Sequence, residues 1–270
     1  MNRSHSQAVA GIHLSGPNAH KTSVVIMTGR FSDGNLKITH LFEKIGGVGR
    51  LFSDERIFEI VREFRPETIF VDCPLTEPPC VSCVRPKCPG VDGCEDLGVA
   101  YMQYLVNDSS RKRKRPINPQ TQRLWDVNLW SLDRYALQEP SYSANMAPLV
   151  ARAKTLQRRL RSLDEALTLR ETHIPLALKH LNDRLGANQD DVLGYRSFGI
   201  GKGCRGRLVE RFFANKWVDL NHLDECASSV ENFHAFIAAF VGALDLDKMT
   251  TQPPNALFSE QGWVCLPSLP

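Results

Sequence analysis

Residues 7–42 read QAVAGIHLSGPNAHKTSVVIMTGRFSDGNLKITHLF, and this stretch decides the fold class. It contains three apolar segments that predict strands, and the last of them alternates polar and apolar residues. The three segments span residues 7–14, 23–27 and 36–42. Between the second and third, the sequence SDGN at 32–35 predicts a turn of the kind that closes antiparallel hairpins. We therefore expect a three-stranded antiparallel meander.

A helix and a fourth strand follow the meander. Apolar residues at 57, 60, 61 and 64 recur at helical spacing after a possible cap at Ser53 or Asp54, and Pro66 ends the helix. Residues 68–73, TIFVDC, then predict a short apolar strand with Asp72 near its end. Three strands, a helix and a strand, followed by helices, is the order of a ribonuclease H-like domain. The prediction is a single α/β domain over residues 1–270, with a mixed sheet flanked by helices.

Several helices are expected in the second half of the chain. Residues 145–168 are amphipathic, with a leucine-rich stripe, and residues 230–244 are apolar over most of the helix circumference and so predict a buried helix. Shorter helices are expected at about 97–106 and 175–185. The tail at 262–267, GWVCLP, predicts a final edge strand.

Composition narrows the class of protein. The 270 residues are 42% hydrophobic and 23% charged, which excludes collagen-like, coiled-coil and wholly disordered chains. A formal net charge of +3 is too small to indicate a nucleic-acid partner by itself. The longest apolar run, 235–244, is too short to cross a bilayer, and the first residues lack the pattern of a signal peptide. We expect a cytoplasmic protein with no membrane partner.

Residues 78–96 have a different character, with four Cys, four Pro and no apolar periodicity. Cys80, Cys83, Cys88 and Cys94 are spaced C-x2-C-x4-C-x5-C, and four thiolates at such spacing can bind one metal ion or cluster. Zinc fits four thiolates, whereas the compact spacing and the proline after Cys88 also fit an iron–sulfur cluster. Cys73 can replace one of the four. The segment is expected to be a metal-binding loop inserted in the domain.

A second candidate metal site comprises His13, Asp72, Glu171 and His234. His13 and Asp72 lie near the ends of the first and fourth predicted strands, and a sheet with these strands as neighbours brings them together. The buried last helix can add His234, and Glu171 precedes the helix that starts near Pro175. Carboxylates and imidazoles that converge in this way bind a divalent metal such as Mg, Mn or Zn.

Five segments together resemble the predicted-nuclease family called domain of unknown function 429. The resemblance covers about residues 8–267 and implies a ribonuclease H-like fold and a metal-dependent nuclease. In that family Asp72 and Glu171 match metal-binding acids, whereas the first strand and the last helix usually carry Asp where this chain has His13 and His234. The segments are GIHLSGP, VDCPL, ETHIP, HAFIAAFVGAL and GWVCLP.

The two histidines change the chemistry that the resemblance implies. Two-metal phosphodiester hydrolysis uses carboxylates to bridge two hard cations, and neutral imidazole does not bridge them and favours Zn, Mn or Fe over Mg. Either the site holds a single softer ion, or hydrolysis has been lost.

Two basic segments are candidates for phosphate binding. In the loop at 107–120, Arg111, Lys112 and Arg113 begin a run of five cations, which either contacts phosphates or is a solvated surface loop. The Gly-rich stretch 197–206 lacks a P-loop or dinucleotide spacing. It resembles the basic loop of the same family, which would place Tyr195, Lys202 and Arg207 near a phosphate.

The function expected from the sequence is a metal-dependent nuclease or phosphodiesterase that acts on DNA or RNA. One alternative is a catalytically inactive nucleic-acid-binding or assembly module of the same fold. Another is a metal-sensing or redox-sensing protein centred on the Cys loop.

Overall fold

The computed structural model describes residues 7–16, 21–46, 54–107, 117–132, 141–167, 169–219 and 221–269. The chain forms two compact units. Unit 1 consists of Met1–Cys73, Thr155–Thr251 and Cys265–Pro270, and unit 2 consists of Pro74–Lys154 and Gln252–Val264. The sequence predicts one domain with a loop inserted at 78–96. In the structure, residues 78–96 lie within unit 2, which also contains helices.

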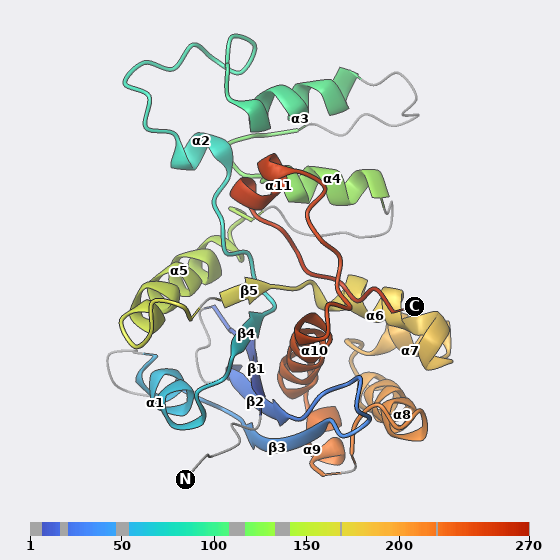
Figure 1. Cartoon of the computed structure of the whole chain (residues 1–270). Helices are drawn as coiled ribbons and strands as arrows, with labels where there is room; N and C mark the ends of the chain where they lie inside the picture. The colour runs from blue at the N-terminus through green and yellow to red at the C-terminus, as the bar shows by residue number, and fades with distance from the viewer. Residues whose placement is uncertain are drawn as a thin grey trace. The chain divides into compact units, whose positions relative to one another are not determined.

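Unit 1 is built on a five-stranded mixed sheet with the order β3-β2-β1-β4-β5 (Figure 1). β1 pairs antiparallel with β2, and β2 with β3, which confirms the predicted meander. β4 pairs parallel with β1, and β5 pairs parallel with β4. The strands are β1 (Ala8–His13), β2 (Ser23–Thr28), β3 (Lys37–Phe42), β4 (Thr68–Val71) and β5 (Leu169–Glu171).

Helices lie on both faces of this sheet, as Figure 1 shows for α1 and α10. α1 (Glu55–Phe64) buries its apolar stripe on one side, whereas α10 (Val230–Leu246) packs on β1, β2 and β4 on the other. α10 is buried at every position from 232 to 244, as its apolar sequence predicts. The remaining helices of unit 1 are α6 (Ile174–Leu185), α7 (Gln189–Gly194), α8 (Gly201–Ala214) and α9 (Leu223–Ser228).

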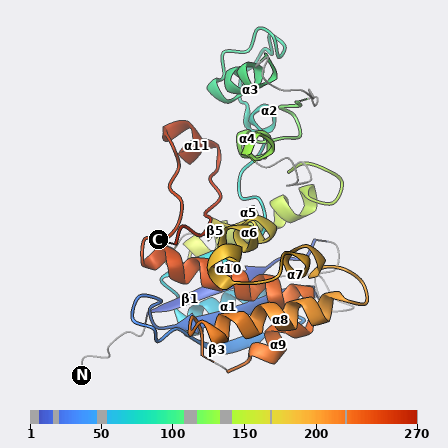
Figure 2. The same cartoon turned by 90° about the vertical axis from the view of Figure 1, so that its right-hand side faces the viewer.

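These helices cover the side of α10 that faces away from the sheet. α6 and α9 contact α10 directly. α8 packs on α10 through Phe212, whose ring centroid is 5.0 Å from that of Phe236 and 4.9 Å from that of Phe240. The rotated view shows α8 running alongside α10 (Figure 2). α10 is therefore enclosed on both sides, which is why it needs an apolar circumference.

Two glycines allow α10 to approach the sheet closely. A Cβ atom at Gly11 of β1 would lie 2.1 Å from the backbone nitrogen of Ala239 and 2.2 Å from the carbonyl oxygen of Ala235. A Cβ atom at Gly242 of α10 would lie 2.4 Å from the side chain of Val9. Side chains at these positions would hold the helix and the sheet apart.

Unit 2 is a small helical assembly. Its helices α3, α4 and α11 contact one another, and aromatic side chains fill the space between them. The ring centroids of Trp125 and Trp263 are 4.8 Å apart, and those of Tyr101 and Phe258 are 5.8 Å apart. The helices are α2 (Pro79–Ser82), α3 (Leu97–Asn107), α4 (Leu124–Leu132) and α11 (Ala256–Gln261), and α5 (Ala147–Arg161) crosses the boundary into unit 1.

A buried ion pair supports the start of α4. The Arg123 side chain is fully buried, and its Nη2 donates to Asp126 Oδ1 at 3.0 Å while its Nε donates to Ser141 Oγ at 2.6 Å. The Ser141 hydroxyl in turn donates to Asp126 Oδ2 at 2.6 Å. A buried charge is tolerated only with such pairing, so this network holds residues 123–126 against the returning chain at 141.

Several local predictions differ from the structure. The amphipathic helix expected over 145–168 ends at Arg161. The tail forms no edge strand among the described residues, and it contributes an isolated antiparallel bridge between Thr250 and Pro267. The Gly-rich stretch 197–206, expected to be a loop, enters α8 at Gly201. Among the described residues, no helix is long and apolar enough to cross a membrane.

Replacing Gly11 with alanine should disrupt the packing of α10. The added Cβ would meet backbone atoms of α10, which cannot move aside as a side chain can, so we expect a loss of about 3 kcal/mol or more in the free energy of unfolding. Urea unfolding followed by circular dichroism measures this change.

Gly206→Ala is the matched control. Gly206 lies within α8, and nothing lies within 4 Å of a Cβ built there. Alanine should stabilise this helix by up to about 1 kcal/mol. Equal stabilities for Gly11→Ala and the wild type would contradict the close approach.

Candidate metal centre

Two neighbouring strands present His13 and Asp72 side by side. His13 ends β1, and Asp72 directly follows β4, where its amide donates to the carbonyl of Ile12 at 3.4 Å. Because side chains alternate along a strand, His13 shares a face with Gly11, and Asp72 shares a face with Phe70. Gly11 and Phe70 are cross-strand partners on the face that α10 covers. The predicted juxtaposition of His13 and Asp72 at this edge is confirmed.

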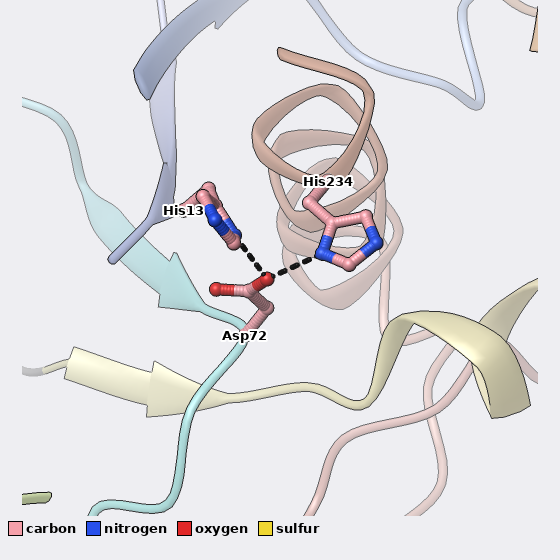
Figure 3. Close-up of side chains that lie close together, drawn as sticks. All are labelled: His13, Asp72 and His234. Carbon is pink, nitrogen blue, oxygen red and sulfur yellow. Dashed lines mark hydrogen bonds and ion pairs between the residues drawn. The ribbon is translucent and has the colours of Figure 1, made fainter. Parts of the chain in front are cut away.

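α10 brings His234 to the same place. Its first turn is capped by the Ser229 hydroxyl, which accepts from the amide of Asn232 at 3.0 Å. The close approach of Ala235 to Gly11 carries the adjacent His234 to the strand ends. The His234 side chain is 4% exposed. Figure 3 shows both imidazoles directed at the Asp72 carboxylate.

Both histidines contact the same oxygen atom of Asp72. Nδ1 of His13 lies 2.6 Å from Oδ2 of Asp72, and Nδ1 of His234 lies 2.7 Å from the same oxygen. The other carboxylate oxygen, Oδ1, is buried and has no hydrogen-bond partner among the described residues. One ligand atom from each of the three residues lies within 4.8 Å of the other two. This arrangement is a two-histidine, one-carboxylate donor set with one carboxylate oxygen unused.

Burial and neighbouring charge act in opposite directions on Asp72. Burial raises the pKa of the carboxyl, but the interactions with His13, followed by those with His234, outweigh burial and hold the pKa well below its usual range. Asp72 is therefore an ionised acceptor, and each histidine donates its Nδ1 proton to it.

The far side of the His234 ring contacts Tyr195 and Arg196. The Tyr195 hydroxyl lies 3.2 Å from Nε2 of His234, and the Arg196 guanidinium lies 3.3 Å from it. Arginine only donates, so Nε2 must accept and the His234 proton must lie on Nδ1. Burial, together with Arg196 and His13, lowers the pKa of His234 to about 4, while burial raises the pKa of Tyr195 to about 12. A neutral imidazole is the form that binds a metal, and coordination through Nδ1 would require the proton to leave that atom.

Arg196 is a site residue that the sequence analysis did not identify. It follows α7 and is exposed, and nothing in its sequence neighbourhood marks it as functional. Its position depends on Arg205 of α8, which donates to the Tyr195 carbonyl at 2.7 Å and to the Ala227 carbonyl at 2.9 Å. The contacts of Arg205 join the start of α8 to the end of α9 and fix the segment that carries Tyr195 and Arg196.

Glu171 does not join the three-residue cluster. It is the cross-strand partner of Val71, so alternation places it on the face opposite to Asp72. The adjacent residue Arg170 faces α10 instead, where it forms an ion pair with Asp245 and lies 5.8 Å from the centroid of the Phe70 ring. The structure therefore brings together three of the four expected ligands, without Glu171.

The expected phosphate-binding residues lie in different settings. Lys202 is exposed on α8, whereas Arg207 is held by Asp191, with Nη2 2.6 Å from Oδ1. Arg111, Lys112 and Arg113 lie outside the described residues.

The four cysteines of the predicted metal-binding loop, at 80, 83, 88 and 94, all lie in unit 2, with free thiols. Among the described residues, no three of these thiols lie within 4.8 Å of one another. Outside this loop, the cysteines at 204, 226 and 265 are buried.

A cavity of about 320 Å³ is lined by two residues that neighbour members of the cluster in the sheet or in the chain. Ser23, which lines it, is the cross-strand partner of His13, and Asn232 precedes His234 by two residues. The Ser23 hydroxyl donates to Asn232 Oδ1 at 2.7 Å. Lys21 and Lys44 also line it, and they pair with Glu231 and Glu43, which lie in the same lining.

The chain matches no protein-family model, no curated protein and no solved structure.

The stability of the metal-free protein should fall between pH 7.5 and pH 5. Unfolded His234 has its ordinary pKa of 6.5 and folded His234 a pKa of about 4, so the unfolded chain binds the extra proton in this window. The expected loss is about 2 kcal/mol at pH 5. Urea unfolding in the presence of a chelator at the two pH values measures it.

His234→Gln should remove this part of the pH dependence, because glutamine does not titrate. His222→Gln is the control, since His222 is a partly exposed histidine that also contacts a carboxylate, that of Glu225. If wild type and His234→Gln lose the same stability on acidification, His234 is not buried in its neutral form.

Proposed function

We propose that the chain is a metal-dependent phosphodiesterase, acting on nucleic acid, whose metal is held by His13, Asp72 and His234. The observation that carries this proposal is the convergence of two imidazoles on one buried carboxylate whose second oxygen has no partner among the described residues. An unpaired buried acceptor costs about 1–3 kcal/mol, and a bound cation would remove that cost.

The fold that we propose is ribonuclease H-like. Three antiparallel strands followed by two parallel strands, in the order β3-β2-β1-β4-β5, support it. A site at the carboxyl ends of β1 and β4 also supports membership of the domain of unknown function 429 family, to which the segments around His13 and Asp72 are similar.

The donor set favours one ion of intermediate softness. Two imidazole nitrogens and one carboxylate suit Zn, Mn or Fe better than Mg, which prefers oxygen ligands. Glu171 lies on the other face of the sheet, so the described residues supply no second carboxylate of the kind that a two-metal site would use. When bound, such an ion acts as a Lewis acid on a phosphoryl oxygen and lowers the pKa of a water molecule.

The protein's own residues have separate roles in this proposal. Asp72 orients both imidazoles, and its charge keeps the Nδ1 protons directed at it in the absence of metal. His13 is the more accessible histidine, with its side chain 18% exposed, so substrate would approach from its side. Arg196 is exposed and anchored on His234 Nε2, where its charge can stabilise negative charge on a phosphate.

A binding function without hydrolysis is the second candidate, and one observation favours it. The cluster has one carboxylate where the resemblance implies several, so its attraction for divalent ions is weaker. Such a protein would bind nucleic acid with a strong dependence on salt and would not cleave it.

Cleavage assays test the proposed function. Labelled single-stranded, duplex and branched DNA and RNA, and a small phosphodiester, are incubated with the protein and Mn, Zn or Mg. We expect cleavage with Mn or Zn in excess of that with Mg, and a loss of at least about 100-fold in Asp72→Asn and His13→Gln.

The matched controls are Glu171→Gln, an acid outside the cluster, and His222→Gln, a histidine outside it. Both should retain activity and the metal affinity measured by calorimetry. Cleavage that survives in Asp72→Asn would refute the site. Metal and nucleic-acid binding without cleavage would instead support the binding module.

A further inference from the structure

We propose that unit 2 holds a structural zinc ion bound by the thiolates of Cys80, Cys83, Cys88 and Cys94. The inference is independent of the function proposed for the histidine cluster, because all four cysteines lie in unit 2 and the cluster lies in unit 1.

The first observation is that the segment between α2 and α3 has no core. Residues 81–93 are all exposed, and the valine at 84 is 95% exposed. Within 84–95, the backbone hydrogen bond among the described residues runs from the amide of Cys94 to the carbonyl of Val91, at 3.2 Å. A segment of this length pays a large conformational entropy cost if it is ordered, and burial does not offset that cost here.

The second observation is that helix ends fix both ends of the segment, close to Cys80, Cys83 and Cys94. Cys80 lies in α2 and Cys83 caps it, three residues later, so one helical turn presents both on the same side. Cys94 lies just before α3, whose first turn is capped by Asp96 Oδ1 accepting from the amides of Gly98 and Val99. The segment therefore begins at the end of α2 and ends at the start of α3, and Figure 1 shows it as the loop that joins these two helices.

The chemistry of the loop selects zinc. The thiols are free, so no disulfide orders the segment, and Cys83 and Cys88 are exposed to solvent. Zinc has no redox chemistry and takes four thiolates in tetrahedral geometry. The C-x2-C-x4-C-x5-C spacing is as compact as that of iron–sulfur sites, but it matches neither C-x2-C-x2-C nor C-x4-C-x2-C, the spacings of common iron–sulfur proteins. The thiols are further apart than ligands around one ion, so zinc binding would draw this exposed loop together.

Metal analysis of the purified full-length protein tests the proposal. We expect one zinc per chain released when the four thiols are titrated with an organomercurial. The cobalt-substituted protein should show a thiolate charge-transfer band and the d–d bands of a tetrahedral site. Cys83→Ser and Cys88→Ser should each weaken zinc binding by at least about 100-fold, because a thiolate ligand is lost.

Two control variants separate this site from other zinc. Cys204→Ala removes a thiol outside the loop and should retain the zinc. His13→Gln alters the histidine cluster and should retain it also. Zinc that is lost in His13→Gln but kept in Cys88→Ser would overturn the proposal, as would iron and sulfide in place of zinc, or no tetrahedral thiolate spectrum.

Proteolysis supplies a readout that does not depend on the variants. Zinc should protect the Lys87–Cys88 bond of the wild type from trypsin, and a chelator should expose it by at least about 10-fold in cleavage rate, because the loop then loses its order. Zinc added back should restore protection. Equal cleavage with and without zinc would overturn the structural role.

Discussion

The contact between α10 and β1 is the interaction on which unit 1 depends. At Gly11 the helix backbone reaches the strand backbone, and a single methyl group would occupy the same space as Ala235 and Ala239. This contact buries a helix that is apolar on nearly all sides and closes the core between the sheet and helices α6 and α9. The same contact determines how close His234 lies to the ends of β1 and β4. Packing of the core and assembly of the site therefore both require the close approach at Gly11.

The Asp72 carboxylate at the centre of the site is ionised although it is buried, because both histidines donate to it. An ionised group so deeply buried is costly, and two hydrogen bonds to one oxygen offset that cost only in part. Neighbouring residues hold His234 in place beside this carboxylate. Arg205 holds the segment that carries Tyr195 and Arg196. Arg196 in turn donates to Nε2 of His234 and so limits His234 to one tautomer.

The sequence predicts the positions of His13, Asp72 and His234, because these follow from the apolar periodicity of the strands and the helix that carry them. Apolar strands ending in His13 and Asp72, and a fully apolar helix beginning near His234, suffice to place all three, because strand neighbours and buried helices leave few arrangements. Glu171 shows the limit of this reasoning. Its face depends on the register of a three-residue strand, and a single step of register moves a side chain to the other face.

Long-range contacts account for the other differences between prediction and structure. Gly201, Gly203 and Gly206 favour a loop locally, yet burial of Leu208 and Phe212 against α10 stabilises a helix there. Arg196 has no periodic or motif signal, because its role arises only when α7, α8 and α10 meet. Unit 2 likewise depends on residues 252–264 returning to α3 and α4, a pairing that no local pattern indicates.

The position of α10 near the end of the chain has a kinetic consequence. The last residue of β4 is Val71, whereas α10 ends at Leu246, so the apolar face of β1, β2 and β4 is complete on the ribosome long before its cover emerges. At about 5–20 residues per second, the interval is roughly 10 to 35 s. During that time the nascent sheet is an open apolar surface, so the protein's yield in the cell depends on what shields that surface until α10 is made.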